Sequence, residues 1–350
     1  MLRVAILGVG WAGTRHVRAI RELVNSGRRD DILVDCLVDN DVEFLQKKAA
    51  VLGIEKTYPD YQAALNDSVV NAVSICLPHR LHCPVAIEAV RAGKHVLVEK
   101  PMALTVADAT RMIEAAESQG VALYVAENES YSAASCMLRE IVQTGRYIGE
   151  LTGAALARGF RAPDYGYSGR RAWLSTPELG GTGHWMLQGV HSMAQLRFIL
   201  GEVAIVYLRE HKASSFRRQD VEGTLSGLLT LGSGLHVSIL QTAETRLAHS
   251  LRGYTLYGDQ GVVRSGREGI EVFSQVLDPD ERPVCLPYPA VSLSPYAAEM
   301  DAFADYVEGR RAGPTTGRSE RRSLAIIEAG YASLESGAPV NLRVQFGDLG

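Results

Sequence analysis

Three glycines in the spacing G-x-G-x-x-G are the first residues of the chain whose pattern points to chemistry. They follow a short apolar run, 4–7, and precede a helix-like segment from 14 to about 24. In such a strand–turn–helix unit the first glycine makes a tight turn, the second admits a pyrophosphate, and the third lets helix and strand pack closely. The positive end of the helix attracts the phosphates, so the pattern predicts a dinucleotide site. The predicted contacts are Gly8, Gly10, Trp11, Ala12 and Gly13.

A carboxylate stands where such a site needs one, at the end of the next apolar run. Asp39 follows run 32–38 and has no adjoining Arg or Lys. A carboxylate there accepts hydrogen bonds from the adenosine ribose and repels the 2′-phosphate of NADP. We therefore expect NAD as the cofactor, with NADP less favoured.

Lys100 is a candidate for the reaction itself because it follows apolar run 95–98. In a doubly wound sheet, ligands bind at the carboxyl ends of the strands. A lysine at that edge can polarise a carbonyl or stabilise an alkoxide. From the local sequence alone, a solvated surface lysine at a turn is the competing interpretation.

Alternating strands and helices must position these groups. Near-continuous apolar runs separated by helix-like segments are typical of a parallel sheet covered by helices on both faces. The runs are 4–7, 32–38, 69–77, 95–98 and 121–125. The fold class is therefore α/β, and residues 1–125 are predicted to form an N-terminal Rossmann domain, a doubly wound parallel sheet.

The pattern changes after the fifth run, where alternating segments are separated by hairpin turns such as 232–234 and 258–261. Such segments predict strands with one exposed face. Residues 126–350 are therefore predicted to form a C-terminal α+β domain on a large, mostly antiparallel sheet. Segments 296–308 and 319–336 are predicted to be amphipathic helices that pack back onto the molecule.

Length and composition limit the class of protein. A chain of 350 residues exceeds the roughly 250–300 that one hydrophobic core serves, which favours two domains. The formal charge of −4 gives no general attraction to nucleic acid or to an anionic membrane. The five cysteines form no C-x-x-C pair, so we expect no metal site and no disulfide framework, as suits a cytoplasmic protein.

The run 93–101, G-K-H-V-L-V-E-K-P, resembles the glucose–fructose oxidoreductase, inositol dehydrogenase and MocA (Gfo/Idh/MocA) family, whose signature is the E-K-P triplet. Further similar motifs lie at 77–82, 145–150, 178–183 and 189–191. The resemblance implies an NAD(P)-dependent dehydrogenase or reductase that acts on CH–OH groups of a sugar, cyclic polyol or sugar derivative. It also implies a homodimer or homotetramer built on the large sheet.

The resemblance implies roles for several residues. Lys100 would hydrogen-bond the reacting oxygen, and His191 would exchange its proton; both would bind substrate. A cis peptide bond between Lys100 and Pro101 is also implied. For His82, an N-terminal helix residue without catalytic duty is the alternative to contact with the cofactor. The cofactor contacts implied near the nicotinamide are Pro78, His79, His82, Glu99 and Lys100.

The chain departs from the family on the helix expected at 184–199. Relatives usually carry Asp four residues before the catalytic histidine, and this chain has Leu187 there. A leucine can neither orient the His191 imidazole nor share its proton. His184 could compensate as a further catalytic residue, because positions 184, 187 and 191 share one face of an α-helix. The competing interpretation is that His184 only caps or packs.

Other side chains are candidates for the substrate pocket. An arginine could bind a carboxylated substrate, and a tryptophan could stack on a pyranose ring; ordinary surface or packing roles are the alternative. The candidates are Asn128, Tyr131, Arg158, Arg161, Trp173 and Trp185.

Three functions are compatible with these features. The preferred one is an oxidoreductase that moves a hydride between nicotinamide and a secondary alcohol or ketone of a carbohydrate-like molecule. The first alternative is an enzyme whose tightly bound NAD is recycled during elimination, epimerisation or glycoside cleavage. The second is a non-catalytic sensor that binds a dinucleotide.

Overall fold

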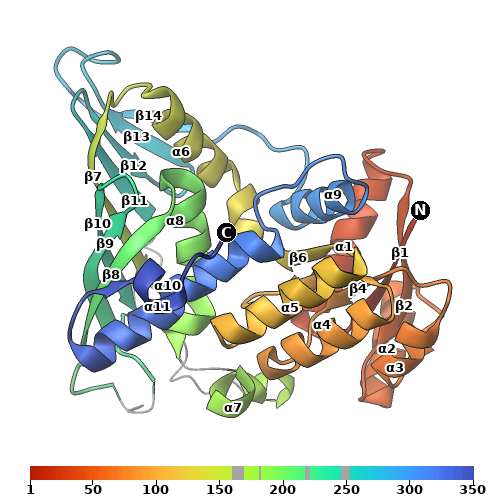
Figure 1. Ribbon diagram of the computed structural model, residues 1–350. Coiled ribbons are helices and arrows are strands. Elements are labelled where there is room, and N and C mark those ends of the chain that lie inside the picture. The colour runs from red at the N-terminus through yellow and green to blue at the C-terminus, as the bar shows by residue number, and fades with distance from the viewer. Residues whose placement is uncertain (160–168, 181–182, 217–220, 246–252) are drawn as a thin grey trace. The chain divides into compact units, whose positions relative to one another are not determined.

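The computed structural model describes residues 1–159, 169–180, 183–216, 221–245 and 253–350. The chain divides into two compact units, both drawn in Figure 1. Unit 1 consists of Met1–Tyr131, Glu178–Gly180 and Ser292–Arg321. Unit 2 consists of Ser132–Pro177, Gly181–Val291 and Arg322–Gly350. Among the described residues, no helix is long and apolar enough to cross a membrane.

Unit 1 is built on a six-stranded sheet in the order β3-β2-β1-β4-β5-β6, in which every neighbouring pair is parallel. This confirms the predicted Rossmann sheet. The chain reverses its direction of travel across the sheet between β1 and β4, which is where such folds bind ligands. The strands are β1 (Leu2–Leu7), β2 (Ile32–Val38), β3 (Thr57–Tyr58), β4 (Ala72–Ile75), β5 (His95–Glu99) and β6 (Leu123–Ala126).

The helices of unit 1 begin and end at residues suited to those places. Asp41 and Thr105 cap two helices by accepting backbone N–H groups, and Gly53 and Gly120 end the same helices in the left-handed conformation. The α-helices are α1 (Trp11–Asn25), α2 (Val42–Leu52), α3 (Tyr61–Asn66), α4 (His82–Arg91), α5 (Val106–Gln119) and α9 (Pro295–Val307). Two short 3-10 turns, η1 (His79–Leu81) and η2 (Asn128–Tyr131), complete the set.

A late segment of the chain completes unit 1. Helix α9 packs against α1, and the two helices lie side by side in Figure 1. Met300 and Phe303 of α9 are fully buried in the same apolar core as Val4 and Ile6 of β1. The Rossmann core is therefore assembled from both ends of the sequence.

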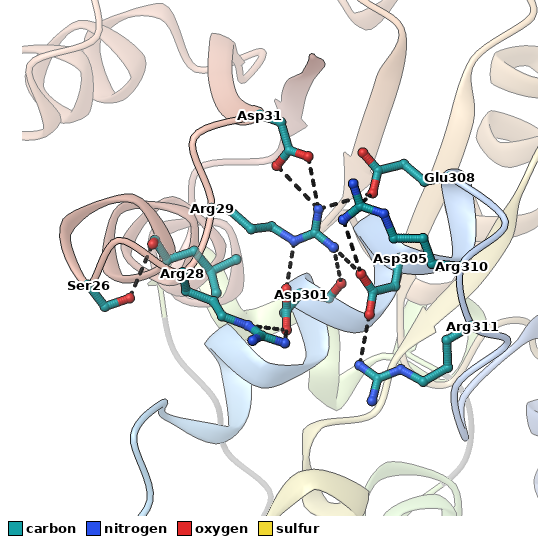
Figure 2. Close-up of polar contacts among 10 residues, drawn as sticks. Ser26, Arg28, Arg29, Asp31, Asp301, Asp305, Glu308, Arg310 and Arg311 are labelled. Atoms are coloured by element: carbon teal, nitrogen blue, oxygen red, sulfur yellow. Dashed lines mark hydrogen bonds and ion pairs between the residues drawn. The ribbon is translucent and has the colours of Figure 1, made fainter.

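Arg29 fastens this late segment with a buried ion cluster, drawn in Figure 2. Its side chain is 4% exposed and lies against four carboxylates. Its Nε donates to Asp301 at 2.6 Å, and Nη1 lies 3.2 Å from both Asp31 and Glu308. It also pairs with Asp305. Burial acts to lower the pKa of Arg29, but hydrogen bonds to these carboxylates raise it above its usual value.

Replacing Arg29 with Met should therefore lower the free energy of unfolding by about 3 kcal/mol, because Asp301 and Asp305 lose their buried counter-ion and keep only the more exposed Arg28, Arg310 and Arg311. Urea denaturation measures this loss. The matched control is Arg111→Met, which removes an exposed arginine that pairs with Asp108, and should change stability by less than about 1 kcal/mol. Equal losses in both variants would contradict the account.

Unit 2 is built on a nine-stranded sheet in the order β14-β13-β12-β11-β7-β10-β9-β8-β15. Only the β7–β10 pair is parallel among the described strand pairs, which confirms the predicted mostly antiparallel sheet. The strands are β7 (Leu151–Gly159), β8 (Val203–His211), β9 (Thr224–Leu231), β10 (His236–Thr242), β11 (Gly253–Gly258), β12 (Val262–Ser265), β13 (Gly269–Phe273), β14 (Val284–Pro287) and β15 (Val340–Asn341).

One face of this sheet is covered and the other is open. Along β10, Val237, Ile239 and Gln241 are buried, whereas the residues between them are exposed. Figure 1 shows α6 (Ala133–Thr144) and α8 (Val190–Leu200) on one face. The remaining helical segments are η3 (Gly169–Ser175), α7 (Pro177–Gly180), η4 (Trp185–Gly189), α10 (Gly317–Ser336) and α11 (Leu342–Phe346).

Candidate cofactor and substrate site

The glycine turn after β1 has the geometry that a bound pyrophosphate requires. Gly8 has a φ of +92°, and a Cβ atom there would lie 2.5 Å from the Cys76 carbonyl oxygen. A Cβ on Gly13 would collide with the Gly8 carbonyl, whereas no atom of the described residues lies within 4 Å of one on Gly10. Gly10 is also the N-cap of α1 and supplies no capping side chain. The backbone N–H groups at this helix end therefore face accessible space beside Gly10.

Asp39 lies beside this turn at the end of β2. Its carboxylate is buried and accepts hydrogen bonds from the backbone N–H groups of Val9 and Asp41, each at 3.2 Å. Two backbone donors fix its direction, and a fixed carboxylate at this place suits ribose hydroxyls and repels a 2′-phosphate. The turn and Asp39 together therefore fit NAD. Trp11 is 52% exposed, and the Arg15 guanidinium lies 3.6 Å from the centre of its ring.

The turn that carries Lys100 follows β5 directly. The Lys100–Pro101 peptide bond is cis, as the resemblance implied. The Lys100 amide donates to Oε2 of Glu99 at 3.1 Å, and the Lys100 residue is half-buried. Lys100 thus lies at the carboxyl end of a central strand, in the same unit as the glycine turn.

Two histidines lie in the neighbouring turn after β4. His79 is buried and its Nδ1–H donates to the Gly180 carbonyl at 2.6 Å. Burial lowers the pKa of His79 well below its usual value, with further contributions from the charges of His82 and Lys100. His79 is therefore held in the neutral form.

His82 is fully buried, and its two ring nitrogens lie 2.8 Å from the Pro101 carbonyl and 2.9 Å from the Leu77 carbonyl. The ring nitrogens of His82 thus face backbone carbonyls, which fits the alternative of a helix residue without catalytic duty, and its contact with the cofactor stays a prediction. Pro78 is half-buried and immediately precedes η1.

In unit 2, the expected α-helix at 184–199 opens as a single π-helical turn, η4, before α8. Gly189 permits this packing, because a Cβ there would lie 2.6 Å from the Trp185 ring. A π turn is wider than an α turn, so positions 184, 187 and 191 do not share a face as an α-helix would place them. His191 is half-buried in the first turn of α8.

The structure favours a packing role for His184. The ring is fully buried, and its Nε2–H donates to the Gly223 carbonyl at 2.7 Å. Nδ1 accepts from Nε2 of Gln241 at 3.2 Å. Burial lowers the pKa of His184, so the ring is neutral and both of its nitrogens are satisfied. Such a ring has no proton-transfer site left to offer a substrate.

Among the other candidates, Trp185 requires a correction. Its side chain is fully buried in unit 2, and its indole N–H donates to the Ile327 carbonyl at 2.9 Å, so it cannot stack on a substrate. The Tyr131 hydroxyl lies 2.6 Å from the Tyr124 hydroxyl inside unit 1. Asn128 and Trp173 are half-buried in η2 and η3. Arg161 lies outside the described residues.

Arg158 contacts the π turn that precedes α8, the helix that carries His191. It is buried on β7, and its Nη2 donates to Oε1 of Gln188 at 3.2 Å. Gln188 belongs to the π turn just before α8 and escaped the sequence analysis, because an isolated glutamine carries no motif. The pair adds polar groups close in sequence to His191, where relatives carry an aspartate.

Replacing His184 with Ala should lower the free energy of unfolding by about 2 kcal/mol, because Gln241 and the Gly223 carbonyl lose their partner. The pH–rate profile of any turnover should keep its shape. Urea denaturation and a pH series of kcat measure the two effects, with His191→Asn as the comparison variant that should alter the profile. A shifted profile in His184→Ala would restore the catalytic hypothesis for that residue.

The fold and the glycine turn define a dinucleotide-binding oxidoreductase. The family model described as the oxidoreductase family, NAD-binding Rossmann fold, matches residues 2–127. A second model, the GFO/IDH/MocA C-terminal domain, matches residues 137–264. The chain therefore belongs to the Gfo/Idh/MocA oxidoreductase family, as the sequence motifs implied.

Similar proteins include several that act on sugars. The chain is 29% identical to a 1,5-anhydro-D-fructose reductase from Ensifer adhaerens, over 78% of this chain and 80% of the relative. It is 26% identical to a D-apiose dehydrogenase from Paraburkholderia graminis, over 97% and 89%. A levoglucosan dehydrogenase solved with NADH and levoglucosan has the same fold, with a TM-score of 0.86 at 19% identity over 97% of this chain and 99% of that one.

Proposed function

We propose that the protein oxidises a secondary alcohol of a sugar, cyclic polyol or sugar derivative with NAD, or catalyses the reverse reduction. The observation that carries the proposal is Lys100, fixed at the carboxyl end of β5 in the unit that bears the glycine turn and Asp39. The sugar-active relatives support this substrate class.

The residues that would hold the dinucleotide are those of the glycine turn, for the pyrophosphate, and Asp39, for the adenosine ribose. When bound there, NAD supplies the hydride acceptor for the alcohol carbon, or the donor in the reverse reaction. Burial and the neighbouring charges keep His79 neutral, so Lys100 is not opposed by a second full charge from that ring.

Lys100 donates a hydrogen bond to the reacting oxygen in this proposal, and its positive charge stabilises the alkoxide that forms as the proton leaves. His191 accepts that proton, directly or through water, because a neutral imidazole nitrogen can act as a general base. In the reductive direction the same two groups return the proton to the oxygen. Gln188, held by Arg158, adds a polar side chain to the π turn that precedes α8.

A substrate screen tests the proposal directly. Sugars, inositols and sugar acids are offered with NAD and, separately, with NADP, and the absorbance of the reduced cofactor is followed. Accumulation of NADH with at least one polyol, and a preference for NAD, supports the proposal. Turnover of substrate without net NADH release would instead indicate a recycled cofactor, and dinucleotide binding without any turnover would indicate a sensor.

Lys100→Met should reduce kcat by about 10²- to 10⁴-fold, because the reacting oxygen loses its charged donor. The Kd for NADH should change by less than about threefold, because the phosphates and ribose bind elsewhere. Steady-state kinetics and quenching of protein fluorescence measure the two. The control is Lys47→Met, an exposed lysine of the same unit, which should match the wild type. A Lys100→Met variant with normal kcat would contradict the assigned role.

We further propose that the protein forms a homodimer or homotetramer through the open face of the large sheet. Leu228 and Leu240 lie on adjacent strands β9 and β10 and are 41% and 36% exposed. An open sheet face with exposed leucines is the kind of surface that association buries.

The double variant Leu228→Glu, Leu240→Glu should therefore have the mass of a monomer in size-exclusion chromatography with light scattering, because charges would be buried at the interface. Val344→Glu, an 85% exposed position on α11, is the control and should keep the wild-type mass. An unchanged mass in the double variant would exclude this face as the interface.

A further inference from the structure

Two buried histidines hold the backbone of the turn that carries Lys100. We propose that His16 and His82 are positioning residues, which fix the direction of the Lys100 side chain without touching substrate. The inference rests on the proposed function, which places Lys100 at the reacting oxygen. It gives His16 a task that no sequence motif assigns, and gives His82 a task different from the cofactor contact that the motif implies.

His16 acts on the amide that begins the turn. It lies on α1 and is fully buried, with Nδ1 2.6 Å from the Ser74 hydroxyl and Nε2 3.3 Å from Oε1 of Glu99. The other oxygen of that carboxylate, Oε2, accepts the Lys100 amide at 3.1 Å. One carboxylate therefore lies between the His16 ring and the Lys100 backbone, and its ion-pair contact with His16 favours the rotamer in which Glu99 accepts the Lys100 amide.

The surroundings favour the charged form of His16. Burial acts to lower the pKa of His16, but Cys76, 3.6 Å away, and Glu99 raise it well above its usual value. Tyr296 and Glu299 of α9 also face this ring, with the Tyr296 centroid at 6.3 Å. Glu299 is buried, and within the described part of the chain neither of its oxygens has a hydrogen-bond partner.

The Glu299 carboxyl differs from the Glu99 carboxyl in its pKa. Burial raises the pKa of Glu299 well above its usual value, and the charge of His16 only partly opposes that rise. A neutral Glu299 leaves Glu99 as the carboxylate within ion-pair distance of His16. The Nε2 edge of the His16 ring therefore faces Glu99, the residue before Lys100.

His82 acts on the carbonyl just beyond Lys100. Its Nδ1 lies 2.8 Å from the Pro101 carbonyl, and Nε2 lies 2.9 Å from the Leu77 carbonyl after β4. Carbonyl oxygens only accept, so a neutral ring can donate to one of them at a time and an imidazolium to both. Burial lowers the pKa of His82, so the ring is neutral and, with its proton on Nδ1, donates to the Pro101 carbonyl from the first residue of α4. Lys100 is therefore bracketed by two bonded backbone groups, its own amide and the Pro101 carbonyl.

Such bracketing matters because a displacement of about 1 Å at a reacting group can lower a rate about 100-fold. A lysine side chain has many rotamers, and its reach depends on where its backbone is held. The two histidines remove backbone freedom at both ends of the residue. They are expected to affect the chemical step more than the binding of the dinucleotide.

The test uses His16→Asn and His82→Asn in the full-length protein. Asparagine keeps a polar side chain but is too short to span both partners of either histidine. Each variant should lower kcat at least tenfold and shift the pH–rate profile, while KM for NAD changes by less than about threefold. His16→Gln, which is longer, should recover part of the lost kcat.

His95→Asn is the matched control. His95 begins β5, the strand that ends at Glu99, and its Nδ1 accepts from the Ala122 amide at 3.0 Å. It is a structural histidine of the same strand without contact to the Lys100 turn. This variant should keep the kcat and pH profile of the wild type. If both test variants match the control, the inference is overturned.

A second readout does not depend on turnover. Lys100 is labelled with acetic anhydride over a pH series, and peptide mass spectrometry gives its rate of modification. The rate should differ at least threefold from the wild type in His16→Asn and His82→Asn, and match it in His95→Asn. Equal rates in all four proteins would overturn the inference. An inactive wild type with altered labelling in the variants would instead refute the proposed function and leave the bracketing of Lys100 supported.

Discussion

The hydrogen bond that the Lys100 amide donates to the Glu99 side chain is the contact on which the site of unit 1 depends. It places a charged side chain at the carboxyl end of β5, where doubly wound sheets bind their ligands. The bond joins two residues that are adjacent in sequence, but the carboxylate that accepts it lies within ion-pair distance of His16, a residue of α1. A local motif therefore has its geometry set by a distant part of the chain.

The same dependence on distant segments holds for the whole of unit 1. The glycine turn and the lysine turn are contiguous stretches of sequence, but the core beneath α1 is closed by α9, from the last part of the chain. Arg29 and its carboxylates make this closure specific, because a buried guanidinium requires charged partners in place. The dinucleotide domain is thus not complete until the C-terminal segment has folded onto it.

The elements of unit 1 could be predicted from sequence because parallel strands buried on both faces leave near-continuous apolar runs. The glycine turn could be predicted because only glycine avoids the collisions found at Gly8 and Gly13. The two-residue strand β3 was missed, since so short a segment carries no periodicity. The family motif, not periodicity, identified Lys100 and His191 as a catalytic pair, and their joint role stays a proposal.

Features that depend on tertiary partners could not be predicted. The π turn at η4 arises from the packing of the Trp185 ring against Gly189, and helical periodicity alone cannot distinguish it from an α turn. Helical spacing suggested His184 and the stacking ability of an indole suggested Trp185, whereas their partners Gly223, Gln241 and Ile327 belong to the interior of unit 2. The sequence does not single out His16, because His16 lies on α1 and its partner Glu99 lies far away in the sequence, at the end of β5.

The most direct test of the central claim is a crystal structure of the protein with NADH and a polyol that it turns over. We expect the Lys100 Nζ and a ring nitrogen of His191 within about 3.2 Å of one substrate oxygen, with the carbon of that oxygen facing the nicotinamide. A structure in which Lys100 points away from the substrate, or in which other side chains alone bind that oxygen, would contradict the account.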